Sequence, residues 1–116
     1  MFWLRHDLTL NRVHDVVRVR EGGDSITLRV DADANRMVAG LSHAQDVLKA
    51  VPADATAEQR QTAIMYFATV IFGKDQAEKL LEFYNNAPDC VLAICGQYFS
   101  TRLMKKITKA QKKAKT

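Results

Sequence analysis

The sequence has few of the residues that mark covalently or metal-stabilised folds. Its 116 residues include two cysteines, two prolines and one tryptophan. Cys90 and Cys95 do not have the spacing of a CxxC motif, and the three histidines are scattered along the chain. We therefore expect no metal site. Both thiols lie in an apolar helical pattern, where cysteine behaves as a small apolar residue, and this usage fits a reducing cytoplasm.

Long hydrophobic runs are also missing. The longest apolar stretch runs from Ala63 to Gly73 and is interrupted by Thr69, so it falls far short of the roughly 20 residues that span a bilayer. The apolar residues 1–4 are followed at once by Arg5, which leaves no continuous core for a signal peptide. We expect a soluble protein of the cytoplasm with no membrane association.

No arrangement of residues predicts catalysis. His6 and Asp7, like His14 and Asp15, are neighbours in sequence, and neighbouring side chains of a strand point to opposite faces. We expect them to be solvated surface groups. The glycine pair at 22–23 lacks the lysine and hydroxyl residue that follow in a P-loop. The hypothesis is a protein without enzymatic activity and without a cofactor.

The charge is divided unevenly along the chain. Residues 102–116 carry seven lysines and arginines and no acid, whereas residues 1–101 have a net charge of −3, which gives +4 for the whole chain. At this length and 47% hydrophobic residues, we expect one domain with a single modest core. The pattern indicates a slightly acidic globular body with a basic helical extension.

A β-hairpin is predicted near the N-terminus. Residues 16–20 and 26–30 alternate in polarity around Gly22-Gly23, which is a strong hairpin pattern. The face expected to be buried consists of Val17, Val19, Ile26, Leu28 and Val30. The opposite face carries Arg18, Arg20, Thr27 and Arg29. A lone hairpin is marginally stable, so residues 2–10, with Phe2, Trp3, Leu4, Leu8 and Leu10, are a candidate third strand.

Helices are predicted over the rest of the chain. Residues 31–33 offer an N-cap for an amphipathic helix that ends before Pro52. Thr56 and Gln59 form a capping-box pattern, and the helix from Ala57 to Phe72 is apolar nearly all round, which predicts a central position. Gly73 is expected to end it, and Asp75 is expected to cap a short helix that follows.

The last helix is expected to begin near Pro88 and to continue into the basic segment. An apolar stripe runs along it through Val91, Leu92, Ile94, Cys95, Tyr98, Phe99, Leu103 and Ile107. The lysines that follow cover one broad face, which is compatible with phosphate neutralisation. We favour the other interpretation, a solvated and partly frayed helix end where the helix dipole favours lysine. A membrane-surface helix is less favoured, because the basic and apolar parts follow one another along the chain.

Three blocks of the sequence resemble a known family. The first is residues 16–24 with residues 28–31, the second lies within residues 67–84, and the third runs from Ile94 to Lys113. Their order resembles the small tail assembly chaperones of long-tailed phages and prophages of Gram-positive bacteria. The resemblance covers roughly residues 15–113 and is carried by apolar and basic patterns.

The resemblance implies a non-enzymatic protein made in the host cytoplasm and absent from the mature virion. Such proteins are thought to coat the tape measure protein and keep it soluble until tail tube subunits polymerise around it. Many have a longer form made by a −1 frameshift, and the Lys-rich ending of this chain suits a slippery codon run. The implied partners are the tape measure protein and the tail tube protein, with self-association left open.

We therefore predict an α+β fold, with a small N-terminal β-hairpin followed by about four helices, the last extended and basic. Residues 1–116 form a single domain, divided into a hairpin at 15–31, a helical core at 33–101 and a basic helical tail at 102–116. The alternatives to a tail assembly chaperone are a small basic nucleic-acid-binding protein with non-specific phosphate contacts, and a structural tail or head-completion protein. The candidate partner-binding residues are Phe67, Phe72, Phe83, Tyr84, Tyr98, Phe99, Arg102, Lys105, Lys106 and Lys109.

Overall fold

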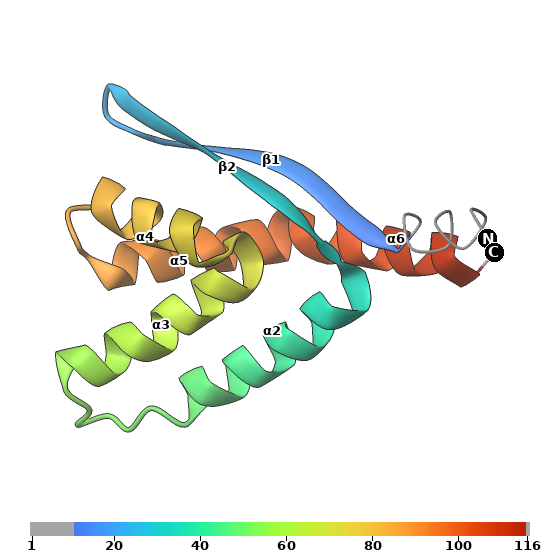
Figure 1. Cartoon of the computed structure of the whole chain (residues 1–116). Helices are drawn as coiled ribbons and strands as arrows, with labels where there is room; N and C mark the ends of the chain where they lie inside the picture. The colour runs from blue at the N-terminus through green and yellow to red at the C-terminus, as the bar shows by residue number, and fades with distance from the viewer. Residues whose placement is uncertain (1–10, 116) are drawn as a thin grey trace.

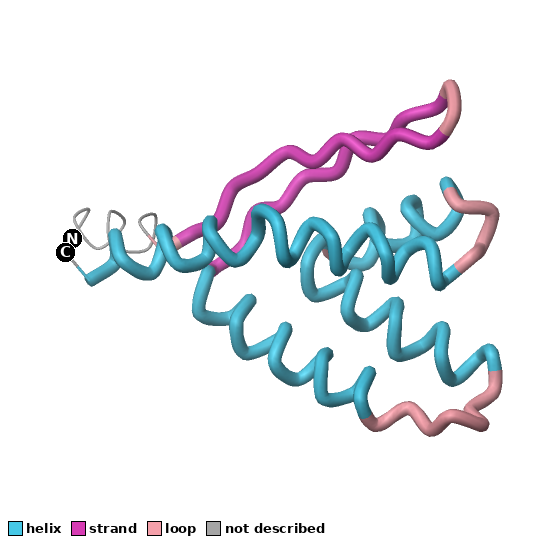
Figure 2. The backbone as a smooth tube through the Cα atoms, turned by 180° about the vertical axis from the view of Figure 1, so that it is seen from behind, coloured by secondary structure: helices cyan, strands magenta, loops and turns pink. Residues whose placement is uncertain are grey.

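The predicted α+β layout is confirmed in a computed structural model, which describes residues 11–115. In this part of the chain an antiparallel hairpin precedes four helices, and the last helix is long (Figure 1). The candidate third strand at residues 2–10 lies outside the described residues. Figure 2, from behind, shows the hairpin along one side of the helices, rising away from them towards its turn.

The hairpin consists of β1 (Arg12–Glu21) and β2 (Asp24–Asp33), paired from Arg12↔Asp33 to Glu21↔Asp24. Each strand is longer than predicted. Gly22 has φ 61° in the turn, a conformation that glycine adopts at little cost. The face expected to be buried is confirmed except at Ile26 near the turn, which is only partly buried. Val13 extends this face by one more residue.

Helix α2 (Ala34–Lys49) begins where the sequence predicts. Asp33 is its N-cap, and a carboxylate oxygen of Asp33 accepts a hydrogen bond from the Arg36 N–H at 2.9 Å. This bond holds the pKa of Asp33 below its ordinary value, because it stabilises the ionised form. The apolar side of α2 then buries Met37, Leu41 and Ala44.

Helix α3 (Ala57–Phe72) is central, as its all-round apolar character predicts. Thr56 and Gln59 form both bonds of the capping box, at 2.9 and 3.1 Å. The helix packs against α2, α4, α5 and β2. Its buried residues are Ala63, Ile64, Phe67, Ala68, Ile71 and Phe72.

Gly73 joins α3 to α4 (Lys74–Phe83) without a loop. It is the C-cap of the first helix and the N-cap of the second, with φ 84°. The prediction that Asp75 caps α4 is therefore wrong. The chain re-enters a helix at Lys74, and this places Asp75 inside the first turn, where its charge still interacts favourably with the helix dipole.

The last helix is continuous from α5 (Pro88–Tyr98) through a π-helical segment, η1 (Phe99–Leu103), to α6 (Met104–Lys115). Figure 1 shows it crossing the whole length of the molecule. The predicted apolar stripe is confirmed, with Leu103 and Ile107 buried, and it continues to Ala110. The basic segment thus packs on β1 and α2 through one side.

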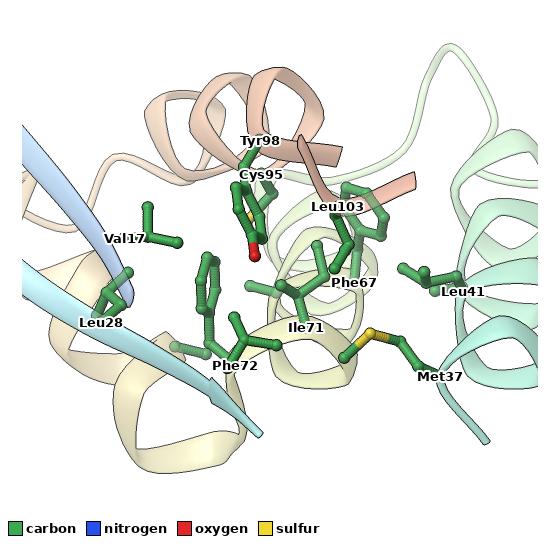
Figure 3. Close-up of a cluster of buried hydrophobic side chains, with 14 of the residues drawn as sticks. Val17, Leu28, Met37, Leu41, Phe67, Ile71, Phe72, Cys95, Tyr98 and Leu103 are labelled. Carbon is green, nitrogen blue, oxygen red and sulfur yellow. The ribbon is translucent and has the colours of Figure 1, made fainter. Parts of the chain in front are cut away.

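The core lies between the hairpin and the helices. Figure 3 shows Val17 and Leu28 from the strands facing Phe72 of α3, with Tyr98 and Cys95 of α5 above them. Met37 and Leu41 of α2 approach the same cluster from the other side. All the described elements contribute to this one cluster.

Candidate functional site

Three of the aromatic residues predicted to bind a partner lie in the core. Phe67, Phe72 and Tyr98 are 4%, 5% and 5% exposed. The Phe72 and Tyr98 rings stack with centroids 5.7 Å apart, and Phe67 meets Phe99 edge to face at 6.4 Å. Their apolar surface is already removed from water by the fold, so these three rings offer almost no area to a partner.

The other three candidate aromatics are partly buried at the edge of the core. Phe83 and Tyr84 meet edge to face at 5.2 Å at the end of α4, and Phe99 lies in η1. Desolvation raises the pKa of Tyr84, and the nearby charge of Glu21 raises it further. These rings support the packing of the helix ends and expose only part of their surface.

Asp15 gathers three of the candidate residues into one polar cluster. Its carboxylate accepts hydrogen bonds from the Tyr98 hydroxyl at 2.8 Å and from the Arg102 guanidinium at 2.5 Å. The Lys106 ammonium lies 3.8 Å away. Burial, followed by the bond to Asp15, raises the pKa of Tyr98. Because the Asp15 side chain is only 6% exposed, the expectation that it is a solvated surface group is wrong.

The remaining lysines of the candidate set face outwards from α6. Lys105 and Lys109 are exposed and border a shallow hollow of about 360 Å³. Lys106 and Lys109 also line a hollow of about 350 Å³ between β1 and α6, together with Arg12, His14 and Lys113. The basic segment therefore presents a positive surface on both sides of its buried stripe.

A broader groove lies on α3 and α4, and we refer to it as the α3–α4 groove. Its volume is about 800 Å³. Met65, Tyr66 and Leu81 are its partly buried apolar residues, and charged residues of both signs lie among its polar ones. The full lining is Ala57, Glu58, Gln61, Thr62, Met65, Tyr66, Thr69, Lys74, Glu78 and Leu81.

The Tyr66 side chain is fixed at this groove by α2. Its hydroxyl lies 2.7 Å from Nδ1 of His43, and the two rings meet edge to face with centroids 5.4 Å apart. This contact joins α2 to α3 and holds the Tyr66 ring in one orientation. An apolar surface with a fixed ring is better organised for a partner than one whose side chains must first be ordered.

The sequence contained a signal for the position of Asp15 and only part of one for the α3–α4 groove. Asp15 has the same strand parity as Val13, Val17 and Val19, so it faces the helices. Met65 and Tyr66 lie on α3 beside Thr62 and Thr69, on the side away from Ile64 and Ile71. No pattern, however, indicated that α4 would leave that side of α3 uncovered.

Comparisons of the chain with models of known protein families, with curated proteins and with solved structures found no match. Within residues 11–115, no helix has both the length and the apolar character needed to cross a membrane. In the same part of the chain, no three His, Cys, Asp or Glu side chains come together as a metal-binding group.

Proposed function

We propose that this protein is a phage tail assembly chaperone that binds the tape measure protein and keeps it soluble during tail assembly. The sequence resemblance motivates the proposal, and the α3–α4 groove is the observation that carries it in structural terms. Met65, Tyr66 and Leu81 line the groove together with polar residues and charges of both signs. Such a surface fits an amphipathic helix, which is the element a long helical tape measure would expose before the tube forms.

The groove supplies the contacts that such a helix needs. Met65, Tyr66 and Leu81 would cover its apolar stripe, and the charges at the border would meet its polar flanks. Three larger apolar residues offer only a small apolar area, so one contact would be weak. Many copies along one tape measure would compensate, because each contact need only delay the aggregation of its own stretch.

The proposal predicts that a long charged side chain in the groove abolishes chaperoning. Thr62 is exposed, lines the groove, and donates to the Glu58 carbonyl at 3.0 Å. Co-expression with the tape measure protein of the same phage should keep that protein in the soluble fraction. Thr62→Arg should reduce the soluble fraction several-fold, because the guanidinium would have to be desolvated beneath the bound helix.

Thr108→Arg is the matched control. Thr108 is also exposed on a helix, donates to the carbonyl four residues earlier at 2.9 Å, and lies on α6 away from the groove. It should leave the tape measure protein soluble. Equal losses with both variants, or no effect of the wild-type chain on solubility, would rule out the groove as the chaperoning surface.

A second candidate function is non-specific binding of nucleic acid by the basic surface. The hollow between β1 and α6 favours it, because cations from both elements line it. Affinity for duplex DNA that falls steeply with salt, and that is weakened by Lys109→Gln but not by Thr62→Arg, would support this function. The absence of binding at low salt would remove it.

A further inference from the structure

Side chains block both edges of the hairpin at one cross-strand pair, Val16 and Arg29. On the β2 edge, the Gln76 amide accepts from the Arg29 N–H at 2.7 Å and donates to the Arg29 carbonyl at 2.6 Å. On the β1 edge, the Val16 N–H donates to Asp15 at 2.8 Å, and Arg102 donates to the Val16 carbonyl at 3.3 Å. No further strand can pair at these positions.

The β1 edge is open beyond this block. In an antiparallel pair, every second residue turns its N–H and C=O groups away from the partner strand. Since Val16 does so, Arg18 and Arg20 do so as well. Among residues 11–115, no group outside the hairpin donates to or accepts from their backbone. Two consecutive outward positions of β1 are therefore free to pair with another strand.

A hollow of about 280 Å³ follows this open edge between β1 and the last helix. Apolar contact is available from Ile94, which is partly buried, whereas Val17 and Val19 are buried beneath the hollow. The hollow is closed towards Val16 by the Asp15 cluster, so it accepts only a short extended segment. Its lining is Val17, Arg18, Val19, Arg20, Ile94, Gln97, Tyr98, Thr101 and Arg102.

Charge decides which occupant fits. The hollow is lined by three arginines and no acidic residue. Arg102 is paired with Asp15, so the charge offered to an occupant comes from Arg18 and Arg20, which are exposed. A second copy that paired through the same edge would bring its own Arg18 and Arg20 against these, and like charges across a strand pair are destabilising. An acidic segment would meet the guanidinium groups favourably.

We propose that the β1 edge at Arg18 and Arg20, with the hollow beside it, is the docking site for an extended acidic segment of a partner protein. The segment adds to the hairpin as a third strand, antiparallel or parallel to β1, by hydrogen bonds to the backbone of Arg18 and Arg20. This site is separate from the α3–α4 groove, and its use does not depend on the proposed chaperone function.

The experiment uses a short fluorescent peptide of alternating valine and glutamate, with a valine and lysine peptide as its counterpart. Binding is measured by fluorescence anisotropy to the full chain and to three variants. Arg18→Ala removes one charge. Arg18→Pro removes the same charge and the outward N–H, and it breaks no hydrogen bond of the hairpin. Thr27→Pro makes the same backbone change on the opposite edge, at the residue paired with Arg18.

The acidic peptide should bind the wild-type chain, and the lysine peptide should not. Arg18→Ala should weaken binding several-fold, and Arg18→Pro should weaken it about tenfold more, the equivalent of one lost hydrogen bond. Thr27→Pro should bind like the wild-type chain. Equal binding by Arg18→Ala and Arg18→Pro would overturn the proposal, since the backbone would then take no part.

Amide hydrogen exchange of the wild-type chain also tests whether the peptide pairs with the backbone of β1. This measurement needs no variant, so its result does not depend on whether a substituted chain folds. The amide protons of Arg18 and Arg20 should exchange rapidly in the free protein and become protected when the acidic peptide is added. Binding without this protection would overturn strand addition. Duplex DNA that displaces the peptide, and that binds Arg18→Pro and Arg18→Ala equally, would assign the arginines to a polyanion surface instead.

Discussion

At the scale of single residues, Asp15 shows that the position of a residue on a strand can decide whether its side chain is buried, even when the side chain is charged. Its place in the β1 alternation turns it towards the last helix, where three side chains and one backbone N–H surround the carboxylate. A nearly buried charge requires such partners, because desolvation without them would be costly. Two of the predicted partner-binding residues, Tyr98 and Arg102, thus help to fix the last helix to the hairpin.

We expect Asp15→Asn to destabilise the fold by about 1–3 kcal/mol, because bonds to a charged group are stronger than neutral ones and Arg102 loses its counter-ion. Urea unfolding followed by circular dichroism measures the change. Asp54→Asn, an exposed site in the loop before α3, is the control and should stay within about 0.5 kcal/mol of the wild type. Equal midpoints for the two variants would show that the cluster contributes nothing to stability.

At the scale of elements, the π-helical segment explains how the apolar stripe of the last helix stays on one side. Tyr98 and Leu103 are both buried although they are five residues apart, a spacing that an ordinary α-helix would place on different sides. The wider turn of η1 brings Leu103 back to the core and leaves Arg102 beside Asp15. π-Helical turns are rare, and they occur mostly as single-turn bulges inside α-helices, as here.

The close approach of α2 and α3 gives a second element-scale expectation. A Cβ at Gly40 would lie 2.9 Å from Cγ1 of Val70. Alanine would gain about 0.5–1 kcal/mol in helix propensity, but the stiff Val70 side chain resists displacement and overpacking costs about 1–3 kcal/mol. We therefore expect Gly40→Ala to lower the free energy of unfolding by about 1 kcal/mol, measured in urea.

The Val70→Ala background tests whether contact with Val70 is what makes Gly40→Ala destabilising. With the valine methyl groups removed, Gly40→Ala should become neutral or stabilising, because only the propensity gain remains. A stabilising effect of Gly40→Ala in the wild-type background would mean that the two helices separate at little cost.

At the scale of the whole molecule, one core joins the hairpin to every described helix. Two ionisable side chains buried in this core, Cys95 and Tyr98, make the stability of the fold decrease at alkaline pH. Cys95 is fully buried, and this raises its pKa from 9.0 to about 12. The fold favours the neutral thiol, so this contribution to stability is complete below pH 9 and is lost as the pH rises towards 12. Tyr98, whose pKa is also raised, acts in the same direction at higher pH.

We expect the wild-type chain to lose about 1.4 kcal/mol more stability than Cys95→Ala between about pH 7 and about pH 10. The reason is that pH 10 lies about one unit above the pKa of the thiol in the unfolded chain, and one unit corresponds to about 1.4 kcal/mol. Urea midpoints of both proteins at the two pH values measure the difference. The alanine variant has its own pH-independent packing loss, so only the change between the two pH values is compared. Parallel losses in both proteins would show that the Cys95 thiol ionises freely in the fold.

The sequence by itself determined the local structure of this protein. Alternation around Gly22-Gly23 predicted the hairpin, and the Thr56 capping box and Pro88 marked helix starts, because caps, turns and periodicity depend on neighbours in the chain. The candidate site was predicted less well. Phe67 and Phe72 belong to the core, and Asp15 was missed.

Only the tertiary structure decided which apolar and charged side chains remain free. Which face of α3 is covered depends on where α4 packs, and which strand positions are capped depends on Gln76 and Arg102, distant in sequence from the hairpin. A side chain's exposure is set by the neighbours that the fold brings to it, and those neighbours are not adjacent along the chain.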